Sequence, residues 1–285
     1  MRDRIAKSVS SRLWRESISS PVVIAITSPF GSTGKTTVAI NMAVELAAEK
    51  ARVLLIDGDI QGPAVANHFF LSEQPAGLPA ALRIAGQQRF DLGQLERLSF
   101  QFQKTTLRIM PGSPNFPSQS VDQDSIATVL DIARTNYDFT VVDLGSIGAA
   151  ENNQSLGLTN AVIALADRTV VVGLADPIGI FRLLGIEGVV AALPTPVDLV
   201  INRLRNSVIA SARREIAITL ERMSTFSPKA YLPDDPQHLD HAVRTGVPAT
   251  ALSRTGPFRQ ALTGFVRTEL LGRKGPLDSR LAKLT

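Results

Sequence analysis

Residues 22–37 read VVIAITSPFGSTGKTT, and this stretch decides the fold of the chain. Its first six residues are an unbroken apolar run, which is typical of a strand buried on both faces. A turn rich in Ser and Gly follows, and apolar residues then recur every four positions, which predicts a helix over residues 36–50. Backbone N–H groups of such a turn, together with the start of the helix, bind phosphate. The stretch therefore predicts a phosphate-binding loop between a buried strand and a helix.

Each residue of this loop has an expected role. Lys35 would reach the β- and γ-phosphates of a nucleotide, and the hydroxyl of Thr36 would bind Mg²⁺. The predicted nucleotide-binding residues are Gly31, Ser32, Thr33, Gly34, Lys35, Thr36 and Thr37. Pro29 stands where the general pattern has glycine, and because proline lacks an N–H we expect a different start of the loop and weaker or slower nucleotide binding. The alternative is a Gly/Ser-rich turn that happens to precede a helix.

Two other apolar runs end in carboxylates. VLLIDGD at residues 53–59 ends in Asp57 and Asp59, and FTVVD at residues 139–143 ends in Asp143. The carboxyl ends of parallel strands meet at one edge of a sheet, which is also the edge that carries the phosphate loop. We expect Asp57 and Asp143 to hold Mg²⁺, directly or through water, and one carboxylate of the first pair to orient the attacking water. The alternative for the first pair is a role as loop caps.

Asn202 follows a further apolar run, residues 197–201, and is the candidate for recognition of the base. Its amide both donates and accepts hydrogen bonds, as an adenine edge requires. A guanine reader usually carries an acidic residue three positions later, where this chain has Arg205, so the pattern favours ATP over GTP. The alternative is that Asn202 is a turn residue at the end of a strand.

Strand and helix patterns alternate along almost the whole chain. The other predicted strands cover residues 53–56, 107–110, 140–142, 169–174, 197–201 and 230–232. The other predicted helices cover residues 125–134, 156–166, 178–192, 208–222, 235–246 and 257–271, and residues 73–79 are predicted as a loop. This alternation predicts an α/β protein with a single-domain P-loop NTPase fold, whose mostly parallel, twisted sheet has helices on both faces. We assign residues 1–20 to a basic N-terminal arm, 21–271 to the nucleotide-binding domain and 272–285 to a C-terminal tail.

The composition excludes several classes of protein. The 285 residues include no cysteine, which excludes disulfides, thiolate metal sites and iron–sulfur clusters and favours a reducing compartment. No apolar stretch is long and charge-free enough to span a bilayer, so we expect a cytoplasmic protein. The basic arm carries Ile5, Val9 and Leu13 at helical spacing. It is either a solvated arm or a peripheral contact with the inner face of the membrane.

These motifs, in this order, resemble the MinD/ParA family of P-loop ATPases over about residues 20–270. The resemblance implies ATP and Mg²⁺ as cofactors, and Lys35 and Asp59 as catalytic residues, with Asp59 activating water. It also implies that Asn202 contacts adenine and that Pro233 and Asp234 belong to the loop on the other side of the base. A nucleotide-linked homodimer is the assembly that the resemblance implies.

Within that family the chain is most similar to the CpaE/TadZ-like and septum-site-determining branch. Residues 28–37, 175–179 and 232–243 carry this likeness. It implies a switch that positions a Tad-type pilus or the division site, with protein partners from the pilus or division apparatus. The alternatives are a partition ATPase that binds DNA nonspecifically, against which the net charge of only +4 speaks mildly, and a nucleotide-dependent ligase or synthetase.

Phe30 departs from the family pattern. The family's signature lysine, which neutralises phosphate charge across the dimer, stands at this position, five residues before Lys35. Phenylalanine cannot take that role, and loss of one charge-assisted contact to a transition state costs about 3–4 kcal/mol. We therefore predict slow or absent hydrolysis and a dimer that is weakened or stabilised by other residues.

Overall fold

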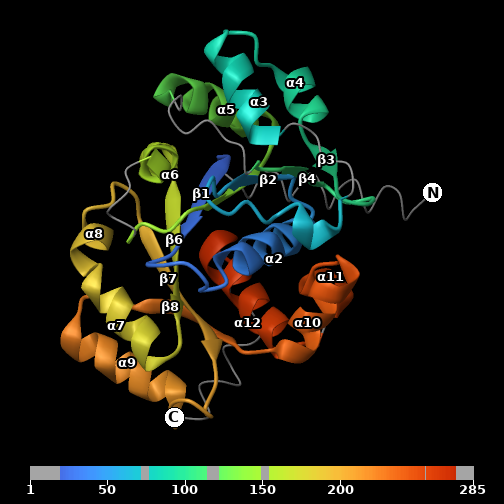
Figure 1. Cartoon of the computed structure of the whole chain (residues 1–285). Helices are drawn as coiled ribbons and strands as arrows, with labels where there is room; N and C mark the ends of the chain where they lie inside the picture. The colour runs from blue at the N-terminus through green and yellow to red at the C-terminus, as the bar shows by residue number, and fades with distance from the viewer. Residues whose placement is uncertain (1–19, 72–76, 114–121, 149–153, 254, 274–285) are drawn as a thin grey trace.

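An eight-stranded sheet lies at the centre of the described part of the chain (Figure 1). A computed structural model describes residues 20–71, 77–113, 122–148, 154–253 and 255–273. The strand order is β3-β4-β2-β5-β1-β6-β7-β8, and every neighbouring pair is parallel except β3 and β4. The strands are β1 (Val22–Thr27), β2 (Val53–Gly58), β3 (Phe100–Gln101), β4 (Leu107–Met110), β5 (Phe139–Leu144), β6 (Arg168–Leu174), β7 (Val197–Leu204) and β8 (Pro228–Pro233). This confirms the predicted α/β fold with a mostly parallel sheet.

Helices cover both faces of the sheet, as predicted. Because side chains alternate along a strand, Val23 and Ala25 of β1 point into one core while Ile24 and Ile26 point into the other. The first core packs under α3 (Gly77–Gly86), α4 (Leu92–Arg97), α5 (Gln123–Asn136), α6 (Gln154–Leu165), α7 (Pro177–Gly185), α8 (Glu187–Ala191) and α9 (Ala212–Met223). The second packs under α2 (Lys35–Ala48), the short η1 (Asn67–Phe69) and α12 (Pro257–Phe265), which continues as the π-turn η3 (Val266–Leu270). Two short helices, α10 (Pro236–Thr245) and α11 (Ala249–Leu252), lie beside α2.

The order of the strands places the phosphate loop at a crevice. From β1 the chain crosses to β2 on one side, and from β5 it crosses back over β1 to β6 on the other. Ligands of open α/β sheets bind where the direction of winding reverses, outside the carboxyl ends of the strands. The register also sets Asp57 of β2 directly beside Asp143 of β5. The topology thus gathers the predicted loop and carboxylates at one edge.

Several elements differ from the predictions. The single helix predicted over residues 178–192 is divided into α7 and α8, because the backbone leaves helical geometry at Ile186 (φ −109°, ψ 11°). The helix predicted from residue 208 begins only at Ala212, whose N–H donates to the side chain of Asn206. Part of the loop predicted over residues 73–79 is helical, since α3 begins at Gly77. Gly77 has a φ of 57° and packs against the Pro111 carbonyl, where a side chain would clash.

The ends of the chain remain as predictions. Most of the predicted arm and tail lies outside the described residues, so the proposed division into arm, domain and tail is not tested. Within the described ranges, Arg273 forms an ion pair at 2.6 Å with Glu49, the residue that follows α2. No helix in those ranges combines the length and the apolar character needed to cross a bilayer.

Candidate nucleotide-binding site

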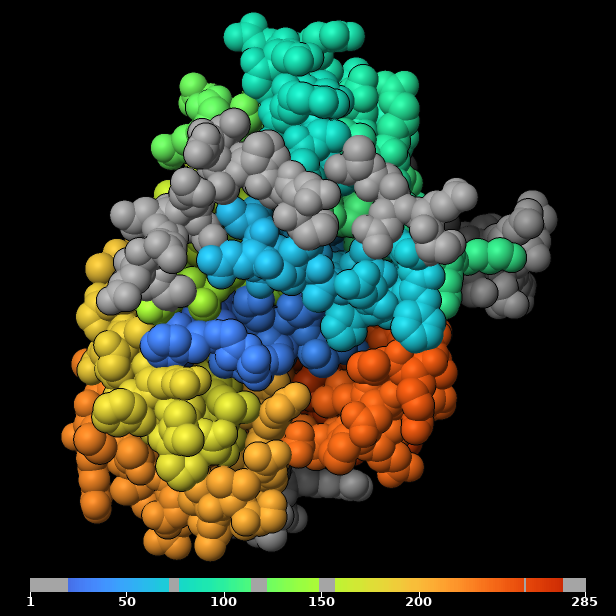
Figure 2. Space-filling model, viewed as in Figure 1, coloured from blue at the N-terminus to red at the C-terminus, as the bar shows by residue number. Residues whose placement is uncertain are grey.

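The phosphate loop, residues 28–34, runs from the end of β1 to the start of α2. Ser32 and Gly34 have φ values of 67° and 84°, and these left-handed conformations turn the chain sharply into the helix. No side chain caps the first N–H groups of α2, so they are available to an anion. Figure 2 shows this early part of the chain, in blue, reaching the surface beside the yellow region that contains α7. The local geometry is therefore that of a phosphate cradle.

Pro29 fits this loop because the loop uses its carbonyl groups rather than its N–H groups at that point. The N–H groups of Ile147 and Gly148, which follow β5, donate to the carbonyls of Ser28 and Pro29 at 3.0 Å each. A Cβ at Gly148 would lie 2.1 Å from the Pro29 oxygen, so this approach needs glycine. The start of the loop is consequently anchored to the segment that follows Asp143.

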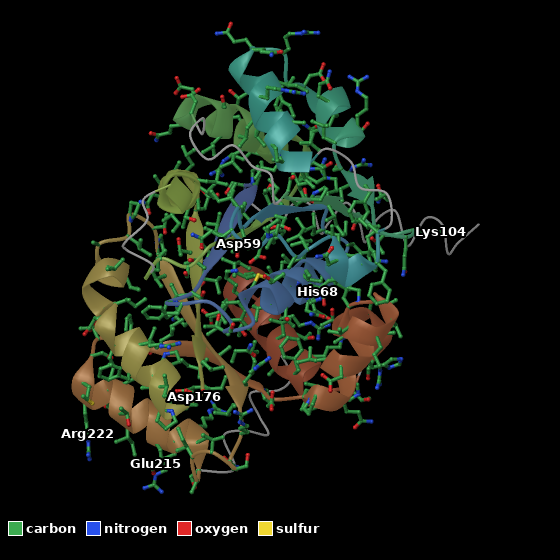
Figure 3. All side chains as sticks on the ribbon, viewed as in Figure 1. Asp59, His68, Lys104, Asp176, Glu215 and Arg222 are labelled. Carbon is green, nitrogen blue, oxygen red and sulfur yellow. The ribbon has the colours of Figure 1, made fainter. Side chains whose placement is uncertain are left out.

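Lys35, the first residue of α2, lies among the predicted carboxylates. Its Nζ is 2.5 Å from Oδ2 of Asp59, and both side chains are only 12% exposed. Burial lowers the pKa of Lys35, but the charges of Asp143 and Asp59 raise it more, so the pKa lies above its usual value. Lys35 is thus held as a cation under the phosphate loop. Figure 3 shows Asp59 near the middle of the molecule.

Asp143 is the most isolated of the carboxylates. It is fully buried, and neither of its oxygens has a hydrogen-bond partner among the described residues. The Thr36 hydroxyl lies near enough to favour the ionised form but does not meet hydrogen-bond geometry. Burial raises the pKa of Asp143 to about 7, although Lys35 lowers it. Two unsatisfied carboxylate oxygens beside a threonine hydroxyl fit a hard cation such as Mg²⁺.

Asp57 and Asp59 differ in how their oxygens are used. Asp57 accepts hydrogen bonds from the N–H of Val65 at 3.0 Å and of Asp59 at 3.3 Å, while burial raises its pKa to about 6. Asp59 lies one residue beyond β2, accepts from the N–H groups of Gln61 and Gly62, and pairs with Lys35. Asp57 therefore fits a role in positioning the segment and a water near the cation, and Asp59 fits the role of the group that moves.

On the base side, Asn202 supports the phosphate loop. Its Nδ2 donates to the Thr33 carbonyl at 2.8 Å, and a Cβ at Gly34 would lie 2.5 Å from the same nitrogen. Pro233, the last residue of β8, pairs in register with Leu204, and Asp234, which follows it, forms an ion pair with Arg205 at 3.3 Å. The three predicted base-side residues thus lie on neighbouring strand ends, and their assignment to adenine stays a prediction.

A hollow of about 260 Å³ lies between the phosphate loop and α7. Its lining includes Phe30, Gly31 and Thr33 from the loop and Asp176 and Arg182 from the α7 region. The Arg182 guanidinium lies over the Phe30 ring, with its Cζ 5.1 Å from the ring centroid. Sequence reasoning missed Arg182, because an arginine on a helix carries no signal of its own. The departures at Pro29 and Phe30 are the local signs in the sequence that the neighbourhood is unusual.

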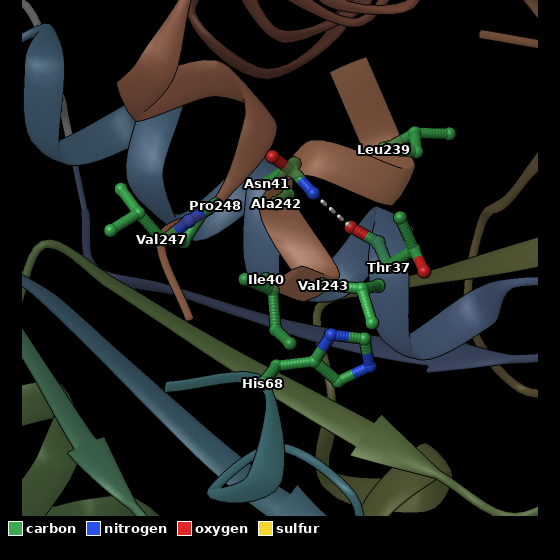
Figure 4. A pocket seen from close by; sticks show the side chains of 9 residues that line it. All are labelled: Thr37, Ile40, Asn41, His68, Leu239, Ala242, Val243, Val247 and Pro248. Carbon is green, nitrogen blue, oxygen red and sulfur yellow. Dashed lines mark hydrogen bonds between the residues drawn. The ribbon is translucent and has the colours of Figure 1, made fainter. Parts of the chain in front are cut away.

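A second, smaller hollow lies on the outer side of α2 (Figure 4). It is lined by Asn41, whose side chain donates to the Thr37 carbonyl, and by the His68 ring, whose pKa is lowered by burial. Its volume is about 40 Å³, which is room for little more than water. This hollow is too small for a nucleotide. Among the described residues no cluster of three His, Asp or Glu side chains forms a complete metal site. A cation beside Asp143 would therefore depend on phosphate and water for its remaining ligands.

Comparison with known proteins shows which family the chain resembles. A family model described as the CobQ/CobB/MinD/ParA nucleotide binding domain matches residues 24–237. The chain is 27% identical over 187 residues to a putative septum site-determining protein MinD of Emiliania huxleyi, covering 66% of this chain and 65% of that protein. It is 31% identical over 134 residues to the tyrosine-protein kinase YwqD of Bacillus subtilis, covering 47% of this chain and 54% of that protein. The chain therefore matches between half and two thirds of the length of these relatives.

The fold also matches solved structures. The septum site-determining protein MinD of Pyrococcus horikoshii, solved with Mg-ADP, superimposes with a TM-score of 0.69 at 19% identity, covering 88% of this chain and 98% of that chain. At this level of identity the match concerns the fold alone. It agrees with the α/β fold and its mostly parallel sheet.

Proposed function

The chain belongs to the CobQ/CobB/MinD/ParA nucleotide-binding family, and we propose that it is an ATP-binding switch that uses Mg²⁺ to position a cellular machine. The observation that carries the proposal is the position of Lys35 beneath the phosphate loop, among Asp57, Asp59 and Asp143. A cation and several carboxylates in one dry site match the charges of a triphosphate and its metal ion. The buried, unsatisfied oxygens of Asp143 mark where a divalent cation fits.

Each residue then has a defined task. Thr36 and Asp143 would hold Mg²⁺, which neutralises the charge of the phosphates when it is bound, and Asp57 would hold a water beside it. When a nucleotide binds, Lys35 would give up its ion pair with Asp59 and contact phosphate oxygens instead. Asp59 would then be free to accept a hydrogen bond from water and act as the catalytic base. Because the lysine expected at Phe30 is missing, the proposal includes only slow hydrolysis.

The nucleotide-bound state would form a homodimer and would be recognised by protein partners. Ile178 and Phe181 of α7 are 65% and 76% exposed, and Ile178 lines the hollow beside the phosphate loop. A nucleotide in the loop would lie next to this apolar surface and link its occupancy to dimer formation. The relative named as a septum site-determining protein supports the division site as the machine. The pilus alternative, like peripheral contact with the membrane, rests on the sequence resemblance.

The test is equilibrium binding of Mg-ATP by titration calorimetry. The chain should bind Mg-ATP, and Lys35→Ala should weaken binding by about 100-fold or more, because several charge-assisted contacts are lost. Lys104→Ala is the matched control, since Lys104 is exposed and lies far from the site (Figure 3). Absence of Mg-ATP binding by the unaltered chain, confirmed as folded by circular dichroism, would contradict the proposal.

Sedimentation velocity without nucleotide, with Mg-ADP and with Mg-ATP tests the switch itself. A dimer that forms only with Mg-ATP, and is lost in Lys35→Ala, is the expected result. Binding of duplex DNA measured at two salt concentrations separates the alternative, because a partition ATPase would show strong binding that falls steeply with salt. We expect no such binding from this chain.

A further inference from the structure

The pair formed by Phe30 and Arg182 brings a cation to the phosphate loop from a different element. Phe30 belongs to the loop itself, while Arg182 lies on α7, which follows β6. The guanidinium lies 5.1 Å from the centre of the Phe30 ring, and both residues line the hollow that also includes Gly31 and Thr33. An exposed cation–π contact of this kind stabilises one position of a flexible arginine by about 0.5–1 kcal/mol. The contact therefore favours one position of the positive charge, over the Phe30 ring.

No acidic side chain among the described residues neutralises the charge of the Arg182 guanidinium. Arg182 forms no ion pair with a described carboxylate. The acidic residue that lines the same hollow, Asp176, accepts a hydrogen bond from the N–H of Gly179 at 2.6 Å and caps α7. The planar guanidinium is thus left with donors that suit a phosphate group.

The hollow opens beside the first half of the phosphate loop, next to the segment that follows β5. A Cβ at Gly148 would lie 3.3 Å from Cζ of Phe30, so the ring sits against the segment that follows β5 and Asp143. Lys35 lies close to Asp143 and Asp59. The lysine of such loops contacts the β- and γ-phosphates. Thr33 lines the hollow as well, and its buried hydroxyl has no hydrogen-bond partner among the described residues. The arrangement sets Arg182 beside Phe30, Gly31 and Thr33 of the loop, close to the segment that follows Asp143.

We propose that Arg182, positioned by Phe30, binds the terminal phosphate of the nucleotide held by the same chain. The inference rests on the proposed function and adds to it a residue that distinguishes triphosphate from diphosphate. Phe30 acts as a positioning residue, because its ring face orients the guanidinium and does not itself contact phosphate. A lysine at position 30 would repel Arg182, so the aromatic residue and the arginine work as a pair.

The test compares the affinities for a non-hydrolysable triphosphate, Mg-AMPPNP, and for Mg-ADP by titration calorimetry. Arg182→Ala should weaken Mg-AMPPNP binding by about tenfold and change Mg-ADP binding less than about twofold, because only the triphosphate reaches the guanidinium. Arg182→Lys should restore part of the preference. Phe30→Leu, which keeps apolar bulk without a ring face, should lower the triphosphate preference by about threefold.

The matched control is Arg222→Ala, an exposed arginine on the outer surface of α9 (Figure 3). It should leave both affinities unchanged. Equal weakening of both nucleotides by Arg182→Ala, or no weakening, would overturn the inference while leaving the proposed function intact. The titrations are carried out at protein concentrations where sedimentation shows a monomer. Any effect of Arg182→Ala then arises within one chain. A preference that appears only in a dimer would place the arginine on the partner's nucleotide and contradict the same-chain assignment.

Discussion

The two sides of the phosphate loop are built differently. On the side proposed to hold Mg²⁺, the register of β2 and β5 sets Asp57 beside Asp143, and Asp143 is buried with unsatisfied oxygens. On the base side, the amide of Asn202 is already bound to the loop, and Asp234 already pairs with Arg205. The first side leaves two buried carboxylate oxygens without a hydrogen-bond partner among the described residues, whereas the second side pairs the Asn202 amide and the Asp234 carboxylate within the chain. If the proposed function holds, the metal side is preorganised at a cost in stability, and the base side rearranges its polar contacts on binding.

The largest expected effect comes from removing the charge of Asp143. Asp143→Asn should weaken Mg-ATP binding by about 100-fold, because a buried ligand oxygen with full charge is lost. The same variant should be more stable than the unaltered chain without ligand at pH 8. The pKa of Asp143 is raised to about 7, so folding favours its protonated form. Stability from this group falls as pH rises from about 4 to about 7 and is lost above that.

Chemical denaturation at pH 5 and pH 8 measures this stability difference. We expect Asp143→Asn to gain on the order of 2 kcal/mol at pH 8 and little at pH 5. Asp131→Asn, at an exposed position of α5, is the control and should show neither gain. A variant that is destabilised at pH 8 would mean that Asp143 is not strained, and the contrast between the two sides would disappear.

The pH dependence of Mg²⁺ binding sharpens the same contrast. Asp57 and Asp143 have pKa values raised to about 6 and about 7, and both must be ionised to hold a cation well. The apparent affinity for Mg²⁺ in the presence of ATP should therefore rise about tenfold between pH 6 and pH 8. Mg²⁺ titrations at several pH values, monitored by calorimetry, test this. An unchanged affinity would show that both carboxylates ionise at ordinary acidic pH.

Asn202→Ala tests the base side and should have a smaller effect. Because the amide supports the Thr33 carbonyl, its loss should weaken ATP and GTP binding alike, by about fivefold, and destabilise the chain by about 1 kcal/mol. Measuring both nucleotides separates this role from base recognition. If binding of ATP alone is weakened, the amide leaves the loop to bind adenine, as the sequence predicted.

The smallest effect is expected at Asp234. Its ion pair with Arg205 is partly exposed, with side chains 26% and 41% accessible, and such pairs contribute about 0–1 kcal/mol. Asp234→Asn should change stability by less than about 0.5 kcal/mol and nucleotide affinity by less than about threefold. Arg205→Gln should give a similar small change. A tenfold loss of affinity in Asp234→Asn with no loss in Arg205→Gln would assign the carboxylate to the nucleotide.

Much of this architecture could be predicted from the sequence. The strand β1 and the strand β4 have the predicted bounds, because buried parallel strands appear as apolar runs with clear turns at both ends. Asp57 and Asp143 could be placed at one edge because parallel strands align their carboxyl ends. The region of α3 could not be predicted, since its sequence has a Gly-Leu-Pro start and its helix depends on packing against Pro111 and α5.

The sequence by itself determined the phosphate loop, the alternation of strands and helices and the identity of the acidic residues, because these are carried by local patterns a few residues long. Only the tertiary structure decided that Asn202 holds Thr33, that Gly148 receives Pro29 and that Arg182 lies over Phe30. Such contacts join residues more than one hundred positions apart and leave no periodic trace in either segment. The sheet brings them together because burial of its two apolar faces sets where each strand ends, and the side chains beyond those ends then find their partners.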